Sequence, residues 1–241
     1  MRMKFLLLLL FMGGCVHRGQ DIKPSANRTL STPVKDNRAA VDEHATQICQ
    51  VAEALEPETT LMVKTLAQKH ELRLEGLKYR LKTKSSIVRK MRLIMKKGTP
   101  MEEVQIKDSF RYTMIVGDTP LGNYNEKVAL VLQDLEKQGQ KVSEVKNYWP
   151  DNDSYSGVNV SMQTPSNVFW ELQFHTEGSY SVTKNTRDDY EELRDAKTSK
   201  SRKKELFIKM TNMWKKVKIP EGVLLPASLH HKEKILSRPI P

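Results

Sequence analysis

Residues 168–176 read Val-Phe-Trp-Glu-Leu-Gln-Phe-His-Thr, and this stretch decides the fold class. Side chains alternate between the two faces of a β-strand, so Glu171, Gln173 and His175 share one face, while Leu172 and Phe174 share the other. Polar side chains are costly to bury on an interior strand unless they line a site. The stretch therefore predicts a sheet that packs on one face and carries chemistry on the other.

The same alternation continues on either side of this strand. It predicts further strands at residues 110–116, 141–146 and 158–162, and the turn residues 164–167 predict a hairpin into the strand at 168–174. Apolar residues that recur every three or four positions predict helices. The expected helices cover residues 38–55, 57–81, 123–138, 180–194 and 201–216. Pro57 is expected to open the second of these. A further helix is expected to begin at a cap formed by Ser85 or Ser86 and to end by residues 98–100. We expect an α+β domain in which a mixed sheet of about four to five strands is flanked by helices.

Composition narrows the class of protein further. The chain has 241 residues, 38% of them hydrophobic, which excludes collagen-like, coiled-coil and multi-pass membrane classes. Two cysteines exclude a disulfide-stapled scaffold. A net charge of +11 predicts a polyanionic partner, which is a nucleotide, a nucleic acid or an anionic membrane.

The first residues of the sequence predict an export signal. Two cations precede a short apolar run in MRMKFLLLLLFMGGC, which is too short to span a bilayer, and small residues lead into Cys15. This pattern resembles a bacterial lipobox, which implies cleavage after residue 14 and a lipidated Cys15. The alternatives are an ordinary signal-peptidase site, or a start codon further downstream and a cytoplasmic protein. We expect a signal peptide at 1–14, a flexible tether at 15–37, N-terminal helices at 38–76, the main domain at 77–218 and a C-terminal tail at 219–241.

Two further stretches carry chemistry. Arg80, Lys82 and Lys90 lie just before and inside the first turns of a helix, where a guanidinium fork, two point charges and free N–H groups favour phosphate. Asp108 opens a strand, with Arg111 three residues on, and a carboxylate there could hold Mg²⁺ beside substrate phosphates. The alternatives are a solvated basic face for the cations and a turn or ion pair for the aspartate.

These stretches together resemble the synthetase domain of the RelA/SpoT family, which makes the alarmones ppGpp and pppGpp. Arg80, Lys82 and Lys90 match the family's Arg-x-Lys with a second Lys eight residues on, and Asp108 matches its strand-opening aspartate. The remaining matches are Lys146 before a loop that ends in Tyr155, and Glu-x-Gln-x-x-Thr at Glu171, Gln173 and Thr176. The resemblance covers residues 77–194 and is nearest to the small, stand-alone, toxin-like branch. The spacing from Asp108 to Arg111 is shorter than in the family, and Asn159 stands where the long enzymes have a histidine.

The resemblance implies a nucleotidyltransferase-like fold and an ATP:nucleotide 3′-pyrophosphokinase that uses Mg²⁺. Arg80, Lys82 and Lys90 would bind the ATP phosphates, and Asp108 would bind the metal. Glu171 would be the second metal ligand or the base for the attacking hydroxyl. The implied acceptor side consists of Lys146 on the acceptor phosphates and Tyr155 stacked on the base, and Gln173 and His175 would be supporting residues. Arg111 would be a further substrate- or phosphate-binding residue.

The acceptor and the biological role stay open at this point. GDP or GTP, adenine nucleotides and a tRNA 3′ end all fit the reaction, and an exported toxin or effector would also have an immunity protein. One alternative is a catalytically degenerate lipoprotein that only binds nucleotides. Another is a surface protein whose basic helix, with Phe207, Met210 and Trp214 on one stripe, docks on anionic membrane; the competing interpretation is a closing helix packed on the sheet. The pair His230-His231 is not expected to bind metal.

Overall fold

A computed structural model describes residues 38–117, 124–149, 155–220 and 223. The signal peptide, Cys15, the tether and the His230-His231 pair lie outside these residues. In the parts of the chain that are described, every helix is too short or too polar to cross a membrane.

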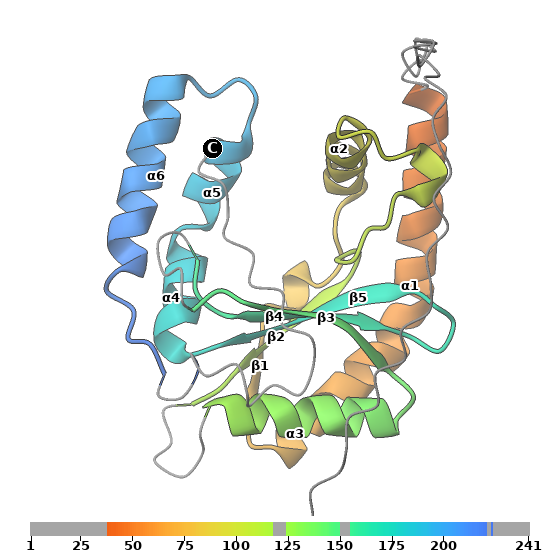
Figure 1. Ribbon diagram of the computed structural model, residues 1–241, viewed down its shortest axis with the longest axis vertical. Helices are drawn as coiled ribbons and strands as arrows, with labels where there is room; N and C mark the ends of the chain where they lie inside the picture. The colour runs from red at the N-terminus through yellow and green to blue at the C-terminus, as the bar shows by residue number, and fades with distance from the viewer. Residues whose placement is uncertain (1–37, 118–123, 150–154, 221–222, 224–241) are drawn as a thin grey trace, which may run out of the picture. The chain divides into compact units, whose positions relative to one another are not determined.

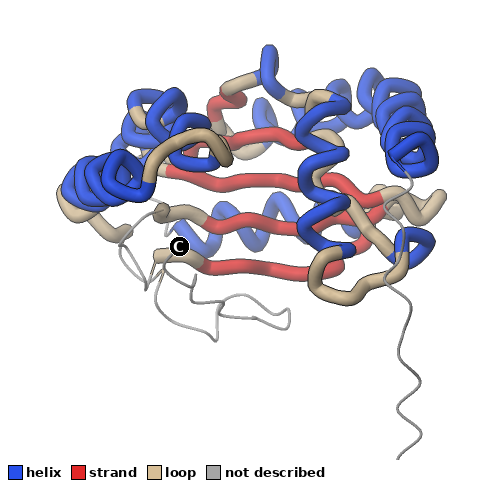
Figure 2. The backbone as a smooth tube through the Cα atoms, turned by 90° about the horizontal axis from the view of Figure 1, so that it is seen from above, coloured by secondary structure: helices blue, strands red, loops and turns tan. Residues whose placement is uncertain are grey.

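The centre of the fold is a five-stranded mixed sheet, as the sequence predicts (Figures 1 and 2). Its strands are β1 (Arg73–Glu75), β2 (Arg111–Ile115), β3 (Lys141–Asn147), β4 (Val158–Gln163) and β5 (Phe169–His175). The spatial order is β1-β2-β5-β4-β3. Only β2 and β5 run parallel, and the other neighbours pair antiparallel.

Helices cover both faces of this sheet. The helices are α1 (Arg38–Lys69), α2 (Lys84–Met95), α3 (Tyr124–Lys137), α4 (Glu177–Asn185), α5 (Arg187–Arg194) and α6 (Lys200–Trp214), with 3₁₀ turns at Leu77–Tyr79 and Met101–Glu103. Figure 1 shows α3 on one side of the sheet, and α2 with α4, α5 and α6 on the other. The helix α3 is the crossover between β2 and β3.

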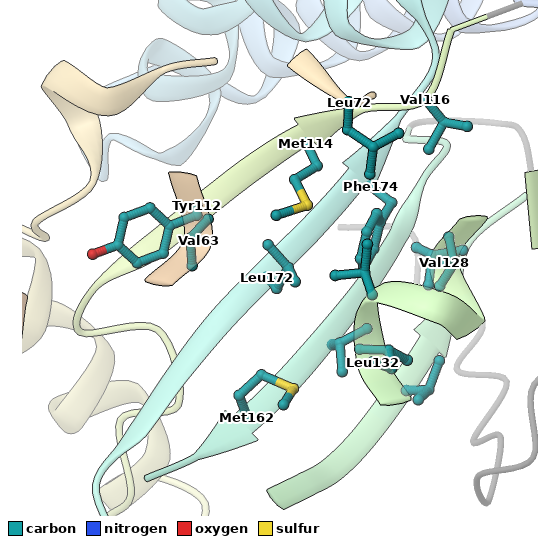
Figure 3. Packing of buried hydrophobic residues seen from close by; sticks show 14 of the residues in the cluster. Val63, Leu72, Tyr112, Met114, Val116, Val128, Leu132, Met162, Leu172 and Phe174 are labelled. Carbon is teal, nitrogen blue, oxygen red and sulfur yellow. The ribbon is translucent and has the colours of Figure 1, made fainter. Parts of the chain in front are cut away.

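The main core lies on the apolar face of the sheet. Tyr112, Met114, Leu172 and Phe174 are buried there, and they pack against side chains of α1 and α3 (Figure 3). The partners include Val63 of α1 and Val128 and Leu132 of α3, all fully or almost fully buried. Because odd and even positions of a strand face opposite ways, this packing turns Glu171 and Gln173 toward the other face.

A second, smaller core joins α1 to α2. Val41 and Ala45 from the first part of α1 pack there with Ile87 and Met91 of α2. The later part of α1 contributes Ala52, Val63, Leu66 and Ala67 to the main core. One helix therefore belongs to both cores.

The expectation that Pro57 opens a second helix is wrong. Pro57 lies inside α1, which continues for 32 residues. A proline inside a helix removes one backbone N–H and displaces the preceding turn, so such helices bend but persist where packing holds them. Here buried side chains on both sides of Pro57 hold the helix, and Figure 1 shows it changing direction part-way along.

The expectation of helix over residues 72–81 is also wrong. Residues 73–75 form the edge strand β1, whose Leu74 pairs with Met114 of β2. Gly76, at φ +69°, ends the strand in the left-handed region that glycine favours, and Leu81 forms an isolated bridge with Phe110. Leucines at 72, 74, 77 and 81 fit both a helical and an alternating period, and pairing with β2 decides between them.

Two helix boundaries and one helix face also differ from expectation. Thr83, not Ser85 or Ser86, caps α2, with its hydroxyl accepting from the Ser86 N–H at 3.3 Å. The helix expected at 180–194 divides into α4 and α5, with Thr186 between them. The inner face of α6 consists of Leu206, Met210 and Trp214, all buried, whereas Phe207 of the expected stripe is only partly buried. The helix packs against α4 and α5, so it closes the domain as in the competing interpretation, with Leu206 in place of Phe207.

Candidate functional site

Strand register brings the polar side chains of four strands onto one face. Arg111 pairs with Glu171 across β2 and β5, and Gln173 pairs with Thr113 on one side and Asn159 on the other. On the outer strand, Lys146 pairs with Asn159. Paired residues project to the same side of a sheet. This confirms the predicted polar face and extends it to β2, β4 and β3.

Asp108 lies at one end of this face and holds two lysines. Its Oδ2 accepts from Lys82 Nζ at 2.7 Å, and its Oδ1 accepts from Lys90 Nζ at 2.7 Å. Lys82 comes from the extended segment before α2, where its backbone N–H donates to Ser109 O at 2.9 Å. Lys90 comes from α2 itself. Three predicted site residues that span 26 positions of the chain therefore meet at one carboxylate.

Burial strengthens the interactions between the charges of this cluster. The side chains of Asp108 and Lys82 are only 15% and 14% exposed. Burial alone favours the neutral acid, but Lys82 and Lys90 outweigh it and lower the pKa of Asp108 to about 2. Burial lowers the pKa of Lys82, although Asp108 opposes the change. The site is therefore a preformed set of charges in a weakly screened environment.

Glu171 is the second carboxylate of the face. Its Oε1 accepts from Gln173 Nε2 at 2.6 Å, and its Oε2 lies 3.5 Å from Asn159 Nδ2. Burial raises the pKa of Glu171, and the nearby charge of Asp108 raises it further, while Arg111 and Lys90 act in the opposite direction. The two carboxylates thus lie on the same side of the molecule and feel each other's charge.

Arg80 pairs with a carboxylate outside this cluster. Its guanidinium forms an ion pair with Glu56 of α1, through Nε to Oε1 and through Nη2 to Oε2 at 3.2 Å. Glu56 is 7% exposed, and the pKa of its carboxyl is lowered, first of all by the hydrogen bond from Arg80. A buried carboxylate needs such a partner. The predicted role of Arg80 on ATP phosphates stays a prediction, which requires the guanidinium to leave Glu56 or to share it.

Lys146 also has a partner that the sequence interpretation above does not include. Its Nζ lies 3.2 Å from Glu144 Oε2, and Lys107 Nζ lies 3.3 Å from the same oxygen. Partial burial opposes ionisation of Glu144, but the two lysines prevail and lower the pKa of its carboxyl. Alternation along β3 places Glu144 and Lys146 on one face, which is the signal that could have found this pair.

Tyr155 and His175 form an internal pair at the other end of the face. The ring of Tyr155 meets those of Tyr148, His175 and Trp214, with centroids 5.3, 5.3 and 5.5 Å away. His175 is fully buried, and burial lowers its pKa to about 3, so the imidazole is neutral at physiological pH. Tyr155 is half-buried among these rings, and its predicted stacking on a base stays a prediction.

The face could hold a divalent cation with two carboxylates. Among the residues that the structure describes, no group of three or more His, Cys, Asp or Glu side chains is placed to hold a metal. Mg²⁺ commonly takes one or two protein carboxylates and completes its shell with substrate phosphates and water. Asp108 and Glu171 fit that donor set.

Comparison with known proteins finds likenesses only among solved structures. No protein-family model matches the sequence, and no curated protein matches it. The type VI effector Tas1, solved with its immunity protein, is 21% identical with a TM-score of 0.43, over 72% of this chain and 95% of that one. The small alarmone synthetase 1 from Bacillus subtilis, solved with its product pppGpp, is 14% identical with a TM-score of 0.47, over 73% and 92%.

A third likeness is to a GTP pyrophosphokinase family protein from Streptococcus pneumoniae, which is 16% identical with a TM-score of 0.45, over 72% of this chain and 87% of that one. At these identities and TM-scores the comparisons assign neither an activity nor a substrate to this chain.

Proposed function

We propose that this chain is a nucleotide pyrophosphokinase, which transfers the β,γ-pyrophosphate of ATP to the 3′-hydroxyl of an acceptor nucleotide. The observation that carries the proposal is the Asp108 cluster: one largely buried carboxylate with a lysine on each oxygen, close enough to Glu171 for its charge to raise the pKa of that side chain. Phosphoryl transfer depends on positioning and on neutralising charge more than on covalent chemistry. A cluster of this kind supplies both.

The lysines supply the phosphate site by changing partners. Lys82 and Lys90 now neutralise Asp108, and a triphosphate offers them a more highly charged anion. When the lysines bind phosphate oxygens, Asp108 oxygens become available to a cation. Arg111, opposite Glu171 in the register, adds a third positive charge beside them.

Magnesium fits this arrangement, with Asp108 as a ligand and Glu171 as the second candidate ligand. When bound, the ion would neutralise the charge that develops on the transferred phosphates. The chain's own residues would do the rest: Lys82, Lys90 and Arg111 orient the phosphates.

Glu171 also suits the role of base toward the acceptor. Its raised pKa gives a stronger base than an exposed glutamate. In the proposed step the acceptor O3′ bonds to the β-phosphorus as the bond from that phosphorus to the α,β-bridging oxygen breaks. AMP leaves, and Glu171 takes the hydroxyl proton. Gln173, beside Glu171, holds the carboxylate in place.

The direct test is product formation from labelled ATP and Mg²⁺ with GDP, GTP, ADP, AMP or tRNA as acceptor. Asp108→Asn and Glu171→Gln should each lower turnover by orders of magnitude, as loss of a metal or oxyanion contact does. Asp134→Asn is a matched control, because Asp134 also holds two lysines, Lys69 and Lys137, but belongs to α3. The absence of any pyrophosphorylated product would end the proposal.

The acceptor and the setting of the reaction are proposed on wider grounds. We include GDP or GTP first, because the B. subtilis structure holds pppGpp, and retain adenine nucleotides and tRNA. We also propose export as a lipoprotein through Cys15, in view of the lipobox-like start, and an immunity protein as partner, in view of the likeness to an effector solved with one. Intact-mass analysis of the native protein tests the first point, since residues 1–14 should be absent and Cys15 acylated.

A second candidate function is nucleotide binding without turnover. The favouring observation is that both oxygens of Asp108 are already taken by lysines and Arg80 is held by Glu56. Calorimetry separates the two, because a binding module takes up Mg²⁺-ATP or an alarmone with no product in the assay above.

A further inference from the structure

Two side-chain amides face the carboxylate of Glu171. Gln173 donates to its Oε1 at 2.6 Å, and Asn159 Nδ2 lies 3.5 Å from its Oε2. An amide has a donating end and an accepting end, so whatever binds its oxygen decides where its N–H points. The partners of the two amide oxygens therefore control the orientation of Glu171.

Each amide oxygen has a hydroxyl partner. Thr113 Oγ1 donates to Gln173 Oε1 at 3.2 Å, and the Tyr155 hydroxyl donates to Asn159 Oδ1 at 2.8 Å. The arrangement is the same on both sides of Glu171: hydroxyl, amide, carboxylate. Thr113 is on β2, while Tyr155 lies just before β4.

Tyr155 is held firmly enough to act as a fixed point. Its hydroxyl oxygen also lies 2.9 Å from Nε2 of His175, whose Nδ1 lies 2.9 Å from Ser179 Oγ. His175 and Ser179 are both completely buried. The hydroxyl donates to Asn159, and His175, which also contacts Ser179 Oγ and the backbone of Ser156, packs against the same hydroxyl.

We propose that Tyr155 is a positioning residue: its hydroxyl orients the Asn159 amide so that the amide N–H, with that of Gln173, fixes the direction of the Glu171 carboxylate. The inference rests on the proposed function for its effect on turnover. A flipped Asn159 would place its oxygen against the carboxylate, which repels it. The buried network is neutral apart from Glu171, and the low pKa of His175 agrees with this.

The proposed positioning role depends on the hydroxyl of Tyr155, whereas base stacking would depend on its aromatic ring. Tyr155→Phe keeps the ring, with its contacts to Tyr148, His175 and Trp214, and removes only the hydroxyl. The two roles therefore give opposite expectations for one variant.

Steady-state kinetics provide the first readout. Tyr155→Phe should lower kcat about tenfold, because the freed Asn159 amide no longer holds the charged Glu171 carboxylate, and should leave KM for the acceptor within about twofold. Asn159→Asp keeps an acceptor for Tyr155 but replaces the N–H with an oxygen facing Glu171, so its kcat should fall further. Tyr180→Phe is the control. The ring of Tyr180 also neighbours His175, but its hydroxyl lies 3.5 Å from Glu75 and so belongs to a different contact. A normal kcat in Tyr155→Phe, or a raised acceptor KM alone, would overturn the proposal.

A second readout does not depend on turnover. The side-chain amide resonances of Asn159, identified by their loss in Asn159→Asp, should shift in Tyr155→Phe and stay in place in Tyr180→Phe. An unmoved resonance in Tyr155→Phe contradicts the positioning role even if the variant has low activity. If the wild-type protein forms no product with any acceptor, the proposed function fails, and the amide resonances still decide what Tyr155 does.

Discussion

Asp108 dominates the electrostatics of the candidate site because both of its oxygens carry a lysine. Its pKa in the folded chain is lowered from 3.8 to about 2, so the folded state favours the ionised form. Its stabilising contribution is therefore complete above pH 3.8 and is lost as the pH falls toward 2.

Comparison of the wild-type protein with Asp108→Asn tests this contribution. In metal-free buffer, the difference between their free energies of unfolding should shrink by about 2 kcal/mol as the pH falls through this window, at about 1.4 kcal/mol per pKa unit. Urea unfolding at pH 7, 4, 3 and 2 measures it. A difference that does not change with pH would show that the lysines do not hold the carboxylate ionised.

Gly157 permits the close approach of β4 to His175. A Cβ there would lie 3.0 Å from His175 Cε1 and 3.1 Å from the carbonyl oxygen of Phe174. Gly157→Ala should therefore destabilise the fold by about 1–3 kcal/mol, the usual cost of overpacking. Gly178→Ala is the control, because its Cβ would meet nothing nearer than 3.9 Å and alanine favours helix α4. Equal stability of the two variants, by urea unfolding, would contradict the close contact.

Single residues could be predicted where local pattern decides their direction. Alternation alone places Glu171 and Gln173 together, and register confirms it. Arg80 could not be placed, because its partner Glu56 is 24 residues away on another helix. Nothing near Arg80 in the sequence tells whether a cation at the end of a 3₁₀ turn faces a substrate or a buried acid.

The helix α2 delivers Lys90 to the site, and its first turn depends on Thr83. The Thr83 hydroxyl accepts from the Ser86 N–H and contacts the Ser86 hydroxyl at 3.0 Å. Thr83→Ala should lower the free energy of unfolding by about 1 kcal/mol, as loss of an N-cap does, while Thr83→Ser should restore it. Chemical denaturation of the three proteins measures this, and an unaffected alanine variant would argue against the cap.

Elements with a strong, single period could be predicted, and ambiguous ones could not. The helix α3 and the hairpin at 164–167 lie within a few residues of expectation, with Asn167 at φ +63° in the turn. The strand β1 was missed because three residues are too few to establish a period, and its pairing with β2 supplies the evidence that the sequence lacks. The sequence also does not show that the helix continues through Pro57, because packing on both sides of this proline keeps α1 continuous.

At the scale of the whole molecule, ligand binding should increase the stability of the folded protein. A ligand that binds only the folded state raises the free energy of unfolding by about 2.7 kcal/mol at 100 times its Kd. A non-hydrolysable ATP analogue with Mg²⁺ should therefore raise the Tm of the wild-type protein, and much less that of Asp108→Asn. Thermal unfolding with and without the analogue measures both, and equal shifts would place the nucleotide away from Asp108.

The long helix α1 has a consequence for how the molecule comes apart. This helix contributes to both cores: Val41 and Ala45 are buried in the smaller core, and Val63 and Leu66 are buried in the main core. Neither core can melt and leave the helix intact, because each supplies part of the burial that keeps this proline-containing helix wound. Heating should therefore give a single calorimetric peak, without a partly unfolded species in which the smaller core between α1 and α2 is lost and the rest survives.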